Sequence, residues 1–460
     1  MTTAAAPDLG KDSIPRLLLT FAIPAIVGLM INALYNIVDR IFVGNGVGAM
    51  GLAGIAVSFP SFIIMMAFGM MVGVGGSVNF AIRLGQGKVA VAERILANSL
   101  VLIVILTVIL VAVQLTFLED VLRFFGATET IMPYAKSYVG ITLLGSIFLT
   151  ANMTMNNFIR ASGFPRIAMG TMIIGAISNT ILDPIFIFVL DMGIGGAAIA
   201  TVISQMFSCT WAASFFISKR SPYRVRMKNL PLNSRTIRAI LSIGFAPFSI
   251  QIASGFMQTI LNKALVVHGG DLAISAMGVA TSTIIFLFMP VMGLCEGSQP
   301  LIGFNFGAQN FKRVRRIYRL TSLVATVIMT VSWIFLRFYA DNVIALFDPN
   351  DSQLIEMGGR ALKTMTLVIP LVGVQIATTV FLQATKCPRL AALLALSRQL
   401  IFLIPCLIIL PDYFGLRGVF YALPVSDFFS FLLVIFVLFG QFRKYRRLEQ
   451  EKMLSPESYA

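Results

Sequence analysis

The sequence predicts an all-α membrane protein with about twelve transmembrane helices, arranged as two six-helix lobes. Three observations support this fold class. Hydrophobic residues make up 57% of the 460 residues, and charged residues make up only 12%, about half of the usual share in a soluble domain. Apolar runs close to the roughly 20 residues that cross a bilayer recur along the chain. The second half of the chain also repeats the pattern of the first half.

The apolar runs give the predicted spans in order. They lie near residues 15–43, 52–82, 95–118, 134–159, 167–190, 195–218, 237–267, 275–304, 317–340, 358–385, 390–410 and 417–440. Helices are expected because the bilayer core offers no hydrogen-bond partner to an unpaired backbone. These spans predict an N-lobe (1–218), a linker (219–238), a C-lobe (239–442) and a basic tail (443–460).

The net charge of +15 comes from loops on one side of the predicted membrane. The basic residues of the even-numbered loops and the tail are Arg83, Lys88, Arg94, Arg160, Arg166, Lys219, Arg220, Arg224, Arg226, Lys228, Arg235, Arg238, Lys312, Arg313, Arg315, Arg316, Arg319, Lys386, Arg389, Arg443, Lys444, Arg446 and Arg447. Most of the loop acids, among them Asp348, fall in odd-numbered loops. Because Lys and Arg mark the cytoplasmic side, both termini are expected in the cytoplasm. Topology thus explains the charge, and no nucleic-acid partner is expected.

Short motifs recur about 223 positions apart in the two halves. The turn at 160–166 matches the turn at 383–389, and the glycine-rich segment 193–196 matches 415–418. Six spans per half mean that both halves enter the membrane from the same side. The lobes are therefore expected to be related by a pseudo-two-fold axis along the membrane normal, as in many transporters.

Asp39 and Asp183 lie inside apolar spans of the first half, and the repeat-related positions of the second half are uncharged. The repeat places Asn262 opposite Asp39 and Cys406 opposite Asp183. An ionisable group at membrane depth is costly and indicates function. Asp39 also has a structural interpretation, as a partner of the neighbouring Arg40 near the membrane surface.

Polar residues at helical spacing accompany these acids. The stripes are Asn32, Tyr35, Asn36 and Asp39, then Asn152 and Asn156, then Asn179 and Asp183, and then Thr201 and Gln205. Such spacing places each set on one helix face. Since polar groups in the bilayer core need partners within the protein, the stripes are expected to converge.

This set suits either of two coupling ions. A buried carboxylate pair can take up and release a proton near neutral pH. Alternatively, Asp39 and Asp183 with the oxygens of Asn156, Asn179 and Thr201 form an oxygen-only cage suited to Na⁺. Tyr35 would tune either ion. No other cofactor is expected.

The second half holds candidates for a substrate contact or a second proton site. Glu296 and Asp427 are acids in apolar stretches, and the polar residues Gln258, Asn262 and Asn305 also lie in spans of this half. The sequence contains no nucleophile with a neighbouring base and no metal-ligand spacing, so no enzyme is predicted.

Several motifs resemble the multidrug and toxic compound extrusion (MATE) family. They are the segments 34–44, 160–165, 179–184 and 299–308, which occur in family order over nearly the whole chain. The chain is most similar to the bacterial branch that contains the staphylococcal multidrug exporter. One residue departs from the family pattern, because Glu296 stands where relatives are expected to carry Gln.

The resemblance implies a monomeric antiporter of the bacterial inner membrane. It implies export of drug-like organic cations in exchange for H⁺ or Na⁺. A lipid-linked precursor flippase of the same superfamily is the alternative function, although its cleft would need cationic residues to hold pyrophosphate. A channel would instead need a pore lined continuously by polar residues.

Overall fold

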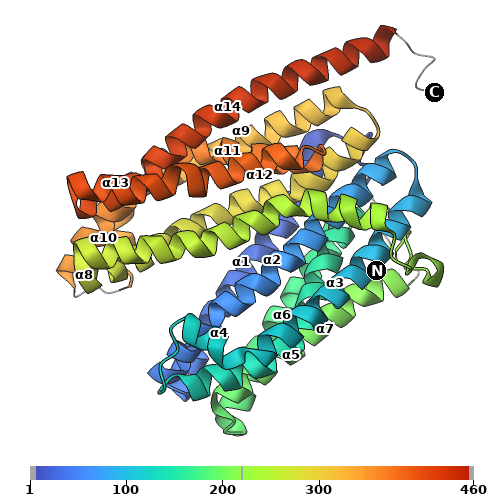
Figure 1. The fold of residues 1–460 in the computed structure, drawn as a ribbon. Coiled ribbons are helices and arrows are strands. Elements are labelled where there is room, and N and C mark those ends of the chain that lie inside the picture. Colours follow the sequence, from blue (N-terminus) through green and yellow to red (C-terminus); the bar gives the residue numbers. More distant parts are fainter. Residues whose placement is uncertain (1–6, 219–220, 348, 350, 455–460) are drawn as a thin grey trace. The chain divides into compact units, whose positions relative to one another are not determined.

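The computed structural model describes residues 7–218, 221–347, 349 and 351–454. These residues form helices joined by turns, and none of them forms a β-strand (Figure 1). Predictions that involve Lys219, Arg220, Asp348 and the ends of the chain (1–6 and 455–460) lie outside the described residues.

The first half is a series of long helices with one short helix, α4, in a loop. Its elements are α1 (Ile14–Gly46), α2 (Ala49–Gly85), α3 (Val89–Thr116), α4 (Leu118–Phe124), α5 (Met132–Ala161), α6 (Pro165–Pro184), the π-helical segment η1 (Ile185–Val189) and α7 (Gly193–Ile217). Within it, α2 packs against α3 and α5, and α7 packs against α5 and α6. Small residues allow close approach, since Gly145 of α5 faces Val202 of α7.

The second half follows the 3-10 turn η2 (Met227–Asn229). Its elements are α8 (Ser234–Gly307), α9 (Phe311–Ala345), α10 (Ser352–Met365), α11 (Ile369–Ala384), α12 (Pro388–Leu396), the π-helical segment η3 (Ser397–Leu403), α13 (Ile404–Phe414) and α14 (Leu416–Leu454). The long helix α8 contains two spans, Ser234–Gly270 and Leu272–Gly307. They are separated at Gly270, whose φ of 64° lies in the left-handed region that favours glycine.

The predicted number of spans is confirmed. Eleven helices among the described residues are long and apolar enough to cross a membrane, and a bent pair brings the number to twelve. The pair is α10 and α11, which meet at an angle of 53°. Pro370 explains where the second helix begins, because the first turn of a helix accommodates proline without the loss of a backbone hydrogen bond. The predicted tenth span, 358–385, is therefore broken rather than continuous.

The residue contacts divide the chain into two compact units. Unit 1 is 1–12 and 23–252, and unit 2 is 13–22 and 253–460. Whereas the predicted lobes assign each helix wholly to one half, the contacts assign the first turns of α1 to unit 2 and those of α8 to unit 1. Glycines make these contacts close: Gly244 lies against Met71 in unit 1, and Gly297 lies against Ala22 in unit 2.

The segment between α7 and α8 is fastened to α3. The side chain of Asn98 donates to the carbonyl oxygens of Asn229 (2.8 Å) and Pro231 (3.1 Å) and accepts from the backbone N–H of Asn233 (2.9 Å). Glu93, which is buried, pairs with Arg226 at 3.1 Å. The described residues of the predicted linker are therefore held against α3.

An aromatic contact adds to this docking. The ring of Tyr223 packs edge-on against Phe80 of α2, with ring centroids 5.2 Å apart. Burial there raises the pKa of the Tyr223 hydroxyl above its ordinary value. The linker thus contacts two helices of unit 1.

Candidate functional site

Asp39 and Asp183 lie buried in unit 1, on α1 and α6. Asp183 is 0% exposed and Asp39 is 8% exposed. Asp183 stands in the last turn of α6, before Pro184, and the π-helical segment η1 follows directly. Pro184 lacks the backbone N–H that an α-helix needs, which explains why the chain changes to the wider π-helical geometry at this point.

The two carboxyl groups lie within hydrogen-bonding reach of each other. Asn179, one turn before Asp183, donates from Nδ2 to Asp183 Oδ1 at 3.0 Å. The described residues supply no donor to Asp39 Oδ1 or to Asp183 Oδ2, and both atoms are buried. Two acceptors this close need a shared proton or a cation between them, because an unsatisfied buried charge is costly.

Two tyrosines and a threonine surround the carboxyl pair. Tyr35 of α1 and Tyr138 of α5 are close enough to interact electrostatically with both acids. The hydroxyl groups of Tyr138 and Thr201 are within hydrogen-bonding reach, which brings α7 to the site. Sequence analysis missed Tyr138. The sequence feature that could have revealed it is a tyrosine within an apolar span, since a buried tyrosine hydroxyl usually finds a polar partner.

Apolar packing holds these helices at the site. Tyr138 belongs to a cluster of buried side chains whose other members are Val43, Ile187, Ile194, Ala197 and Ala198. The cluster draws on α1, α5, η1 and α7. The candidate site therefore rests on rigid helices, and only η1 departs from α-helical geometry.

Asn156 does not join this group. Its Nδ2 donates to the carbonyl oxygen of Ala168 at 2.8 Å and to Thr171 Oγ1 at 2.6 Å. Thr171 precedes Asp183 by twelve residues on α6, which is about 18 Å along a helix. Of the predicted cage, Asn179 contacts the carboxyl pair and Thr201 lies beside Tyr138, whereas the amide of Asn156 joins the other ends of α5 and α6.

Among the second-half candidates, Gln258 and Asn262 contact each other. Gln258 Nε2 donates to Asn262 Oδ1 at 3.0 Å, and both side chains are exposed. Asn305 is fully buried and donates to the carbonyl oxygen of Leu301, within its own helix. Glu296 is half-buried on the second span of α8. The structure does not gather these residues into one site.

Asp427 has a partner that sequence analysis missed. Arg398 of η3 donates from Nε to Asp427 Oδ1 of α14 at 2.6 Å. The pair places a cation within an apolar span of the second half. The sequence feature that could have revealed this pair is an arginine in the apolar run 388–414, together with an acid in the next apolar run.

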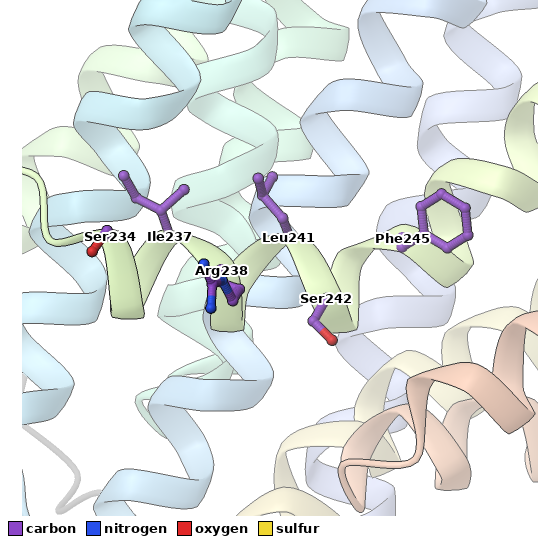
Figure 2. A pocket seen from close by; sticks show the side chains of 6 residues that line it. All are labelled: Ser234, Ile237, Arg238, Leu241, Ser242 and Phe245. Carbon is purple, nitrogen blue, oxygen red and sulfur yellow. The ribbon is translucent and has the colours of Figure 1, made fainter.

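A surface hollow of about 550 Å³ lies along the first turns of α8. Figure 2 shows its lining side chains, Ser234, Ile237, Arg238, Leu241, Ser242 and Phe245, which all come from this one helix. None of them is a predicted site residue. We therefore place the candidate site at the carboxyl pair, where buried charge and missing donors coincide.

Known proteins similar to this chain include multidrug exporters. Multidrug export protein MepA of Staphylococcus aureus (strain MSSA476) is 28% identical over 429 residues, which cover 93% of this chain and 94% of the relative. The protein of the same name from Staphylococcus haemolyticus (strain JCSC1435) is 27% identical and covers 94% of both chains.

Solved structures confirm the fold. A crystal structure of MATE in complex with MaL6 has a TM-score of 0.91 at 24% identity and covers 97% of this chain and 100% of that one. An outward-facing multidrug resistance MATE family transporter of the MOP superfamily has a TM-score of 0.90 at 23% identity, with coverage of 98% and 100%.

A family model described as MatE matches the chain twice, at residues 24–185 and 247–408. The second match begins and ends 223 residues after the first, which confirms the internal repeat. Both acids of the candidate site fall in the first match. The resemblance noted in the sequence is thus confirmed, and the chain belongs to the MatE family, whose members are membrane transporters and not enzymes.

Proposed function

We propose that this protein exports amphipathic organic cations in exchange for H⁺ or Na⁺ by alternating access. One observation carries the proposal: two carboxyl groups lie within hydrogen-bonding reach inside unit 1, and each has a buried oxygen for which the described residues supply no donor. The similarity to staphylococcal multidrug exporters supports export of drug-like compounds.

The carboxyl pair suits either coupling ion. One proton shared between Asp39 and Asp183 gives both oxygens a hydrogen-bond partner. One Na⁺ does so through oxygen ligands, and Asn179 Oδ1, also buried without a donor among the described residues, adds a third. Tyr35 and Thr201 tune the affinity of the site for the ion.

Ion binding changes the packing of α1, α6 and α7, because these helices meet at the site. The ion can shift the equilibrium between outward-open and inward-open states only by its different affinity for the two. Repacking around Asp39 and Asp183 then lowers the affinity for the exported cation.

We also infer the setting of this transport. The protein acts as a monomer in the bacterial inner membrane, with both termini in the cytoplasm. The arrangement of basic loops and the length of the apolar helices support this placement.

Transport in reconstituted vesicles tests the proposal. Export of a fluorescent cation such as ethidium is measured with a pH gradient alone and with a Na⁺ gradient alone. Wild-type protein should respond to one gradient, which identifies the ion. Asp39→Asn and Asp183→Asn should remove that response, because an amide keeps the shape of the acid and loses its charge change.

Thermal unfolding in detergent serves as the control for these variants, since both should remain folded. Wild-type protein that responds to neither gradient would contradict ion-coupled export. Export by folded Asp39→Asn at the wild-type rate would remove the carboxyl pair from the coupling step.

A further inference from the structure

A cluster of aromatic rings in unit 2 joins three helices near their ends. Tyr445 of α14, which is 2% exposed, stacks on Phe311 of α9 with ring centroids 5.7 Å apart and lies edge-on to Phe381 of α11 at 5.9 Å. Phe442, almost one turn before Tyr445, packs against Tyr318 of α9 at 5.6 Å. The end of the last span is therefore held against the first turns of α9 and the last turn of α11.

The turn between α11 and α12 lies beside the same cluster. The thiol of Cys387 is 3.9 Å from Gln441 Oε1, and Lys444 is close enough to this thiol to interact with it electrostatically. Three segments that are far apart in the sequence thus meet at one end of unit 2. They are 311–319, 386–389 and 441–447, and none of them contains an acid.

Exposed basic side chains of these segments form one surface, which we call the basic platform. On α9, the residues Lys312, Arg316 and Arg319 follow the spacing i, i+4 and i+7, which places them on one helix face. Within the described part of the chain, no member of the platform forms an ion pair. Like charges held together without acids attract anions. The platform consists of Lys312, Arg316, Arg319, Arg389, Arg443 and Lys444.

The fold does not require this charge, because the related helix of unit 1 lacks part of it. Counted from the first residue of each helix, Arg319 of α9 corresponds to Ala97 of α3. Ala97 is fully buried beside Asn98, which holds the linker against this helix. In unit 1 the corresponding position is thus covered by the protein itself, whereas in unit 2 it carries an exposed arginine.

The platform lies at the ends of apolar spans. Lys312, Arg389 and Lys444 each stand one residue inside the end of a candidate span. The 35 residues of α9 extend about 52 Å along a helix, whereas the hydrocarbon core is about 30 Å thick. The first turns of α9 therefore reach the level of the lipid headgroups, where Lys and Arg side chains meet the phosphates of anionic lipids.

We propose that the basic platform binds the headgroups of anionic phospholipids in the leaflet at this end of the spans. The exposed Lys and Arg side chains pair with the phosphates, and the acyl chains lie along the apolar spans. In the proposed orientation this is the cytoplasmic leaflet. The binding site is separate from the carboxyl pair, and it depends neither on the exported compound nor on the coupling ion.

Lipid binding to the purified full chain tests this site. Phosphatidylglycerol and phosphatidylcholine with the same acyl chains are titrated separately into the protein in detergent, and bound lipid is measured by native mass spectrometry. Wild-type protein should bind phosphatidylglycerol at least about tenfold more tightly. Each lost cation should weaken phosphatidylglycerol about fivefold and leave phosphatidylcholine within about twofold. The test variant is the triple substitution Lys312→Gln, Arg316→Gln and Arg319→Gln.

A matched triple variant separates this site from a general effect of net charge. Lys88→Gln, Arg94→Gln and Arg166→Gln remove the same charge from exposed positions of unit 1. This control should keep the affinity for phosphatidylglycerol within about threefold. If the α9 variant does not fold, the double variant Arg443→Gln and Lys444→Gln leaves α9 intact and should lose at least about tenfold.

Three results would overturn the inference. They are equal affinity of wild-type protein for the two lipids, equal loss in the unit 1 and unit 2 variants, and binding of polyglutamate as tight as that of phosphatidylglycerol. The last result would assign the platform to acidic segments of soluble proteins. None of these measurements requires transport, so the lipid site and the proposed export can fail separately.

Discussion

Single residues give the two halves of the chain different chemistry. Asp183 is fully buried and accepts a hydrogen bond from Asn179 at 3.0 Å, while the residue opposite it in the repeat, Cys406, is a free thiol. Burial raises the pKa of any acid, which brings a carboxyl group closer to neutral pH and takes a thiol further from it. This difference supports the proposal that coupling belongs to the first half at this position.

The difference predicts opposite outcomes for two substitutions. Asp183→Asn should remove gradient-driven export, a loss in rate of at least about tenfold, which is at least about 1.4 kcal/mol in the transport barrier. Cys406→Ala should retain export within about twofold. The two rates are compared in vesicles at equal protein content. Loss of coupling in Cys406→Ala would show that the second half takes part.

At the scale of elements, the docking of the linker onto α3 has a measurable consequence. Asn98 makes three hydrogen bonds to the segment 229–233. Each contributes about 0.5–1.5 kcal/mol net, so the loss of all three in Asn98→Ala should cost about 1.5–4.5 kcal/mol of stability. The midpoint of thermal unfolding in detergent should fall, and trypsin should cut at Arg224 and Lys228 more rapidly.

Thr116→Ala, at the other end of α3, is the matched control. Thr116 is exposed and donates only to the carbonyl oxygen of Ala112 in its own helix. The Thr116→Ala variant should leave the unfolding midpoint and the rate of trypsin cleavage unchanged. An unchanged cleavage rate in Asn98→Ala would indicate that the linker is held by other contacts, such as that of Tyr223 with Phe80.

At the scale of the whole molecule, the basic loops predict one orientation in the membrane. Cysteines placed singly near Arg224 and Arg315 in a Cys-free background should be labelled only from the cytoplasmic side. The background is feasible because Cys209, Cys295, Cys387 and Cys406 are all free, so no disulfide is lost. Labelling of either site from outside intact cells would reverse the assigned topology.

The sequence by itself determined the fold class, the number of spans, the repeat and the two acids Asp39 and Asp183. Long apolar runs leave the helix as the form that satisfies the backbone in a bilayer, and a carboxylate within such a run stands out from its neighbours. Both signals are local along the chain, or recur at an offset of about 223 residues, so they can be recognised without knowing which helices are in contact.

Tertiary structure decided which polar groups meet. Helical spacing gives the face of a helix that a residue occupies, but neither its depth nor its neighbour. Asn156 therefore carried the same sequence signal as Asn179, although it bonds about 18 Å along α6 from Asp183. Tyr138 and Arg398 were missed for the same reason, since their partners lie on other helices and only packing brings them together.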